Sequence, residues 1–171
     1  MREFTGLAFL FFVVLMITMG ASAQSTLHLT SPDFPDQGNI PREFTCQGTD
    51  ISPTLKIEGV PAGTRTLALI VDDPDAPGKI WVHWVVFNIP PATAEIKSGV
   101  NPGTQGRNDF GTVKYGGPCP PSGTHRYMFK LYALDTYLNL SEGIRKRRLE
   151  EAMEGHILQQ TVLTGLYNKS W

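Results

Sequence analysis

Hydrophobic residues occur along this chain mainly in short runs and in alternation with polar residues, which are both typical of β-strands. Residues 66–71 and 81–89 are nearly continuous apolar runs and predict buried central strands. Residues 55–60 alternate with period two, as a half-buried strand does. The strongest alternation, over residues 125–134, places His125 and Tyr127 on the same face of the predicted strand.

Less regular segments complete the predicted set of elements. We expect an opening strand near Thr26, a second strand over residues 42–46, and a last strand over 161–167. Residues 147–160 give the one convincing helical pattern, with His156 on its apolar stripe as a packed, hydrogen-bonded residue. Many strands with one or two peripheral helices predict a mainly β sandwich.

The first 23 residues have the three parts of a secretory signal peptide. A positive charge at Arg2 precedes an apolar run from Leu7 to Met19, and small residues follow at positions 20–23. The run is shorter than the roughly 20 apolar residues that span a bilayer, which disfavours a membrane anchor. We therefore expect a periplasmic or secreted protein whose single domain covers residues 24–171.

Charge and cysteine content narrow the partners further. The net charge is −1, and the basic residues at 145–148 are followed by acidic ones that can pair with them on a helix surface. This balance argues against nucleic acid or an anionic membrane as the main partner. Cys46 and Cys119 are the only two cysteines. In an exported protein they are candidates for one disulfide, although sequence alone does not bring them together.

An acidic turn at residues 72–77 offers the first candidate chemistry. It holds Asp73 and Asp75 among two prolines, which restrain the backbone, and the next strand carries His83. His125 and Tyr127 come from another strand and can join them. Two imidazoles and a phenol could bind an anion, with a carboxylate fixing one imidazole tautomer.

Other interpretations stay open from the residues alone. Two histidines and a carboxylate would also suit zinc or iron, as in a metal-dependent enzyme. A hydrolase lacks an evident nucleophile, because Ser122 has no Gly-x-Ser-x-Gly setting and Cys119 lies between prolines. The polar groups could also simply satisfy one another. The glycine- and proline-rich residues 101–121 predict an ordered loop over the site, with Phe110 and Tyr115 as packing residues.

Several of these segments together resemble the phosphatidylethanolamine-binding proteins, also called Raf kinase inhibitor-like proteins. The two signature regions are Asp73-Pro-Asp-Ala-Pro77 with Trp81-x-His-Trp84, and Gly117-Pro118 with Gly123-Thr-His-Arg-Tyr127. Further fragments, such as Asn108-Asp-Phe-Gly111 and Ala152-Met-Glu-Gly-His156, resemble the short bacterial (YbhB/YbcL-like) branch. The resemblance covers nearly all of the chain after residue 23.

The resemblance implies a large antiparallel sheet packed on a smaller one, with a small anion pocket and no cofactor. It assigns the following ligand-binding residues: Asp73, His83, Gly117, Pro118, His125 and Tyr127. It further implies Asp75, Pro77 and Trp84 as supporting residues, Arg126 as a buried partner of the acidic turn, and a cis bond before Pro77. Bacterial relatives suggest a homodimer.

These observations predict a non-enzymatic binding protein for a phosphate-like anion or a phospholipid head group. The alternative is an inhibitor of a protease or kinase that acts through its surface loops. A metal-dependent enzyme is the third hypothesis.

Overall fold

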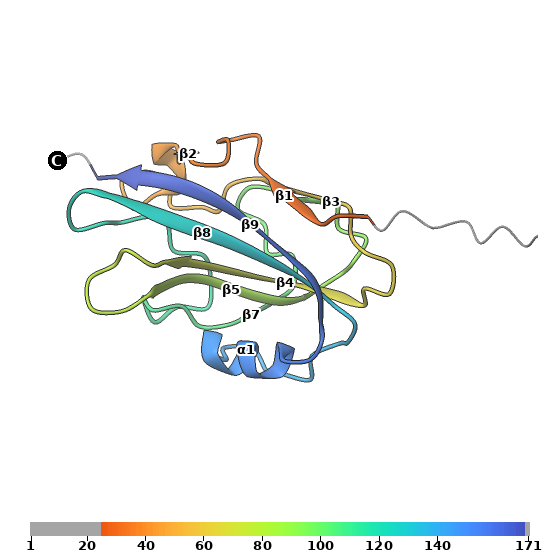
Figure 1. Cartoon of the computed structure of the whole chain (residues 1–171). Helices are drawn as coiled ribbons and strands as arrows, with labels where there is room; N and C mark the ends of the chain where they lie inside the picture. The colour runs from red at the N-terminus through yellow and green to blue at the C-terminus, as the bar shows by residue number, and fades with distance from the viewer. Residues whose placement is uncertain (1–24, 170–171) are drawn as a thin grey trace, which may run out of the picture.

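The computed structural model describes residues 25–169, which form two packed β-sheets and one α-helix (Figure 1). The large sheet has the strand order β2-β9-β8-β4-β5-β7, and the small sheet has the order β1-β3-β6. The elements are β1 (His28–Thr30), β2 (Gly38–Asn39), the 3-10 helix η1 (Arg42–Phe44), β3 (Leu55–Glu58), β4 (Thr66–Asp73), β5 (Trp81–Ile89), β6 (Glu95–Ile96), β7 (Thr104–Gln105), β8 (Thr124–Leu134), α1 (Lys146–Met153) and β9 (Ile157–Asn168). The predicted β-sandwich is confirmed.

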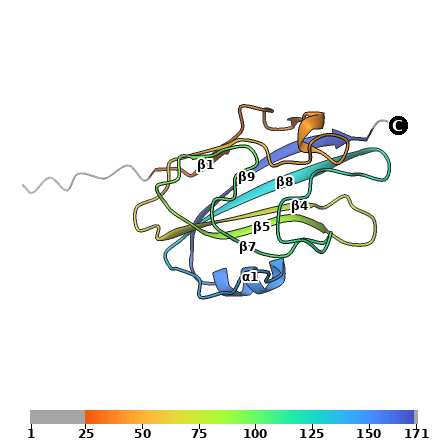
Figure 2. The same ribbon diagram turned by 180° about the vertical axis from the view of Figure 1, so that it is seen from behind.

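The centre of the large sheet is the antiparallel set β5, β4 and β8, as the three apolar patterns predict. Every residue of β4 is buried, because both faces of this strand are covered. The small sheet packs on one face, which we call the front, where it encloses side chains such as Leu69 and Phe129. Helix α1 covers the other face, the back, where Ile70 contacts the cluster that contains Leu149 (Figures 1 and 2).

Two local predictions are wrong. Residues 42–44 form the 3-10 helix η1 rather than a strand. Helix α1 ends at Met153, and residues 157–160, predicted to be helical, begin β9 instead. Strand β9 pairs with β8 along nearly its whole length, so tertiary pairing overrides the helical spacing of the local sequence.

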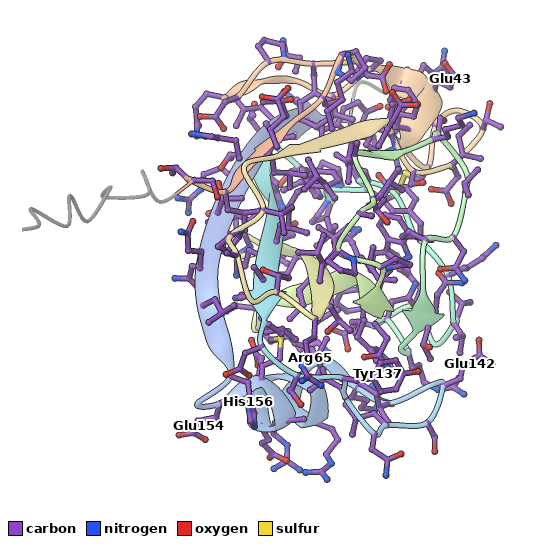
Figure 3. All side chains as sticks on the ribbon, turned by 90° about the vertical axis from the view of Figure 1, so that its right-hand side faces the viewer. Glu43, Arg65, Tyr137, Glu142, Glu154 and His156 are labelled. Carbon is purple, nitrogen blue, oxygen red and sulfur yellow. A yellow bond between two sulfur atoms is a disulfide. The ribbon has the colours of Figure 1, made fainter. Side chains whose placement is uncertain are left out.

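His156 consequently lies outside the helix. It is exposed, and its Nδ1 lies 2.8 Å from Oδ1 of Asp135. Figure 3 shows His156 and Glu154 at the α1 end of the molecule, with Glu43 of η1 at the opposite end. The prediction of a hydrogen bond is right, and the prediction of a packed position is wrong.

The predicted signal peptide lies outside the described residues. Within residues 25–169, no helix is long and apolar enough to cross a membrane. Cys46 and Cys119 form a disulfide with a Cα–Cα distance of 5.5 Å, so the candidate pairing is confirmed. It connects the turn after η1 to the glycine-rich loop.

Candidate functional site

A cavity of about 220 Å³ lies where β4 ends and β5 and β8 begin. Antiparallel pairing brings these three strand ends to one end of the large sheet, away from the α1–β9 connection (Figure 1). The residues that line the cavity are Asp73, Ala76, Pro77, Trp81, His83, Phe110, Cys119, Pro121 and Tyr127. Three of the predicted ligand-binding residues, Asp73, His83 and Tyr127, therefore meet in one place.

Asp73 is buried in the cavity wall and is held by two donors. Nδ1 of His125 lies 2.7 Å from Oδ2, and the main-chain N–H of Asp75 donates to Oδ1 at 2.8 Å. His125 is itself buried and is not among the lining residues. It acts on the cavity through Asp73, whose carboxylate it fixes in one orientation.

His83 occupies a β-bulge in β5. Val71 and Asp72 are consecutive in β4 but pair with Trp84 and Val82, so His83 is the extra residue between them. A bulge redirects a side chain, and here it turns the imidazole toward the cavity. Nδ1 lies 2.6 Å from the carbonyl oxygen of Gly116.

This contact fixes the hydrogen-bonding role of His83. A carbonyl oxygen only accepts, so Nδ1 carries a proton and donates it. Burial lowers the pKa of His83 below its ordinary value of 6.5, which favours the neutral ring. Nε2 then carries a lone pair. The free nitrogen of the neutral ring therefore offers an acceptor to the cavity rather than a donor.

Two donors of the cavity lining have no hydrogen-bond partner in the part of the chain that the structure describes. They are the indole Nε1 of Trp81 and the hydroxyl of Tyr127, both buried atoms. Burial, helped by the negative charge of Asp73, raises the pKa of Tyr127, so its hydroxyl stays protonated. Buried polar groups are nearly always bonded, so two unpartnered donors in one cavity indicate a place for a ligand or water.

Aromatic rings form another part of the wall. The Phe110 ring meets Trp81 edge-on at 5.5 Å and His83 at 5.3 Å, while His83 meets Tyr127 at 5.1 Å. Phe110 belongs to the glycine-rich loop, so the prediction of an ordered loop over the site is confirmed. Asn108 holds this loop in place, because its side-chain amide donates to the carbonyl groups of His83 and Lys114.

The acidic turn is fixed by Asp75 and Arg126. The guanidinium donates to both carboxylate oxygens, at 2.9 and 2.7 Å, and these hydrogen bonds lower the pKa of Asp75 to about 2. Arg126 is thus the predicted partner of the turn, but its side chain is 54% exposed rather than buried. No described peptide bond is cis, so the implied cis bond before Pro77 is absent.

Other predicted residues lie beside the cavity rather than in its lining. The N–H of Gly117 donates to Asp50, and the carbonyl of Pro118 accepts from Cys46, so both serve the loop. The amides of Gly116 and Gly117 are both bonded within the protein and do not point freely at an anion. Trp84 donates to Gln105, outside the cavity.

Sequence reasoning missed Trp81 and Phe110 as lining residues. Trp81 had a detectable signal, because it lies two residues before His83 on the same strand and so tends toward the same face. Phe110 had none beyond its place in the loop.

The structure also bears on the two enzymatic interpretations. Cys119 is consumed by its disulfide and is no free nucleophile. Among residues 25–169, no group of three His, Cys, Asp or Glu side chains is arranged to hold a metal ion.

Comparison with known proteins identifies the family. The sequence pattern described as phosphatidylethanolamine-binding protein matches residues 30–168. The chain belongs to this family. A UPF0098 protein of Methanothermobacter thermautotrophicus is 51% identical over 150 residues, which are 84% of this chain and 99% of the relative.

Solved structures of family members share the fold. The crystal structure of a phosphatidylethanolamine-binding protein homolog from Chlamydia trachomatis has a TM-score of 0.83 and 41% identity, over 85% of this chain and 99% of that one. E. coli YbcL, described as a new member of the mammalian family, has a TM-score of 0.78 and 31% identity, over 86% and 100% of the two chains. The predicted family and fold are confirmed.

Proposed function

We propose that this protein is an exported, non-enzymatic binding protein whose cavity holds a small phosphate-like oxyanion, either free or as a phospholipid head group. One observation carries the proposal: the unpartnered donors of Trp81 and Tyr127 face the same cavity. Oxyanions accept several hydrogen bonds at once and would satisfy both donors. The name of the family, which refers to a phospholipid, agrees with this ligand class.

Calorimetric titration of the protein with phosphate, phosphoethanolamine and phosphotyrosine tests the proposal. The informative variant is Tyr127→Phe, which removes a hydroxyl that no described residue needs. A hydrogen bond to a charged group is worth about 1.5–3 kcal/mol, so affinity should fall about tenfold or more. Stability should fall little, since at most a weak contact with the main chain of Cys119 is lost.

Tyr132→Phe is the matched control, because this tyrosine lies on the same strand but on the opposite face of the sheet. It should leave ligand affinity unchanged. Failure of all three ligands to bind the wild-type protein would overturn the proposed function, and so would equal affinity in the Tyr127 variant.

The alternative function is inhibition of a protease or kinase through surface loops. Its support is the exposure of Val100 and Phe110, two large apolar side chains around the glycine-rich loop. Phe110→Ser alters both the loop and the cavity wall, whereas Val100→Ser alters the loop region alone. An inhibitor should therefore lose activity with Val100→Ser and keep it with Tyr127→Phe.

Export is tested separately. The predicted signal peptide implies a mature N-terminus near Gln24. N-terminal sequencing of the protein from the periplasm or medium of expressing cells should find this end. Full-length protein in the cytoplasm would refute export without affecting the binding proposal.

A further inference from the structure

We propose that Asp73 and Nε2 of His83 accept a hydrogen bond from the ligand, so that the cavity selects a singly protonated phosphate group. Free phosphate monoanion and phosphomonoester monoanions carry such a proton. Sulfate and phosphodiesters do not. This inference rests on the proposed function and narrows its ligand to free phosphate or a phosphomonoester, which excludes the diester of an intact phospholipid.

The charge around the cavity disfavours a doubly charged ligand. None of the described residues that line it is lysine or arginine, and its one formal charge is the Asp73 carboxylate. Nearby cations are already paired: Arg126 with Asp75, and Lys79 with Asp109 at 2.9 Å. An oxyanion therefore meets a like charge unless a proton lies between them.

Asp73 can accept a hydrogen bond from the P–OH group of the ligand. Each of its oxygens accepts one bond within the protein, from His125 or from the amide of Asp75. A carboxylate oxygen has two lone-pair sites, so each oxygen can accept one more bond. Asp73 is also buried, so its remaining capacity can be used only by something in the cavity.

His83 adds a second acceptor beside the first. Its Nδ1 proton is committed to the Gly116 carbonyl, which leaves Nε2 as the only ring nitrogen available to a ligand. The cavity thus combines the two donors of Trp81 and Tyr127 with the acceptors Asp73 and His83. A singly protonated phosphate group presents the complementary set, with P–O acceptors and a P–OH donor.

Sulfate gives the sharpest comparison, because it has the same tetrahedral shape but no proton near neutral pH. A site built to bond an O–H rejects an analogue that lacks it strongly, since its own polar groups are then left unpaired. By calorimetry at pH 6, wild-type protein should bind phosphate at least about 100-fold more tightly than sulfate.

Asp73→Asn should reduce this preference to less than about tenfold, because an amide can donate to sulfate as well as accept. The matched control is Asp135→Asn, which removes an Asp–His hydrogen bond of similar length at the α1 end of the molecule. It should keep the wild-type preference. Thermal unfolding of both variants shows whether they are folded. If Asp73→Asn is unfolded, the ratio of phosphate to sulfate affinity in the wild-type protein still tests the proposal.

A second pair of ligands separates a monoester from a head-group diester. About half of the methyl phosphate keeps a P–OH group at pH 6, whereas dimethyl phosphate has none. The monoester should bind and the diester should bind at least about tenfold more weakly.

The outcomes separate the two proposals. Equal binding of phosphate and sulfate, or of the two methyl esters, would overturn the selection by Asp73 and His83 but leave an anion site. Absence of binding by every one of these anions would overturn both.

Discussion

Asp72 and Asp73 are neighbours in β4, but they point to opposite faces of the large sheet and have different surroundings. On the back, Asp72 is fully buried between two lysines, with Lys130 Nζ at 2.8 Å and Lys146 Nζ at 2.5 Å. On the front, Asp73 has one histidine and a main-chain amide, and it borders a cavity. The same kind of side chain is enclosed by two lysines on one face and borders a cavity on the other.

This difference separates a structural carboxylate from a candidate functional one. Asp72 joins β4, β8 and α1 through its two lysine ion pairs, although its Oδ1 accepts no hydrogen bond within the described residues. Asp73 belongs to a wall whose donors at Trp81 and Tyr127 are incomplete without a ligand. Two unpartnered donors that line one cavity are therefore a better guide to the site than the presence of acidic residues.

The largest expected effect on stability comes from the disulfide that holds the cavity wall on the front of the large sheet. The Cys46–Cys119 disulfide closes a sequence separation of 73 residues, and Cys119 lines the cavity. Replacing both cysteines with serine should cost about 4 kcal/mol in the free energy of unfolding, from the chain entropy of a loop this long. Urea unfolding measures it, and a loss below about 1 kcal/mol would show that the loop is held mainly by its hydrogen bonds.

The second prediction separates the two carboxylates directly. Asp72→Asn leaves two largely buried lysines without their counterion, which should cost about 3 kcal/mol of stability. Phosphate affinity should not change, because Asp72 is on the other face. Asp73→Asn should show the reverse pattern, with a smaller stability loss than Asp72→Asn, because an amide oxygen can still accept one of its two hydrogen bonds, and a large change in ligand preference. If Asp72→Asn altered phosphate affinity as strongly as Asp73→Asn, the two faces would not be independent.

The ability to predict these regions from sequence also differs. The three central strands follow from two continuous apolar runs and one period-two pattern, and the convergence of Asp73, His83 and Tyr127 follows from the family signatures. Residues 157–160 were misassigned because Ile157 continues a helical stripe, while pairing with β8 decides their conformation. Local spacing carries no information about that partner.

The sequence predicts which residues meet at the site, but it does not predict the hydrogen bonds that they make. No pattern shows that His83 sits on a bulge and gives its Nδ1 proton to Gly116, since both depend on how β4 and β5 pair. Likewise, the exposure of Arg126 depends on where its face of β8 meets solvent. Roles as donor or acceptor therefore required the structure.

The third prediction uses pH to test the ligand's proton. A phosphomonoester loses its second proton near pH 6, so affinity should be constant below that pH and fall about tenfold per unit above it. Burial lowers the pKa of His83 below its ordinary value, so its ring gains no charge as the pH rises through this upper range. The other titratable groups at the cavity are Asp73, Tyr127 and, behind Asp73, His125.

Calorimetry from pH 5 to 8 measures this profile. Replacing the ester with a phosphonate of higher second pKa should move the break to higher pH, because the titrating group belongs to the ligand. A break that stays at the same pH for both ligands would assign the titration to the protein instead.

The smallest effect is expected from the third carboxylate of the turn. Asp75 is partly exposed and pairs with the exposed Arg126, so Arg126→Gln should lower the unfolding temperature at pH 7 by no more than a few degrees. The folded-state pKa of Asp75, about 2, lies below its ordinary value of 3.8. The stabilisation is thus complete well above pH 3.8 and is mostly lost as the pH falls to 2, where Asp75 is protonated in the unfolded state and about half protonated in the folded state.

Thermal unfolding of wild type and variant at pH 7, 4 and 2 follows this loss, and added salt at pH 7 should reduce the difference as well. A difference that persists at pH 2 would mean that Arg126 acts through packing of its aliphatic stem rather than through Asp75. In that case the turn would depend on the prolines and on the Asp73–His125 contact, and the exposed ion pair would contribute little to the cavity wall.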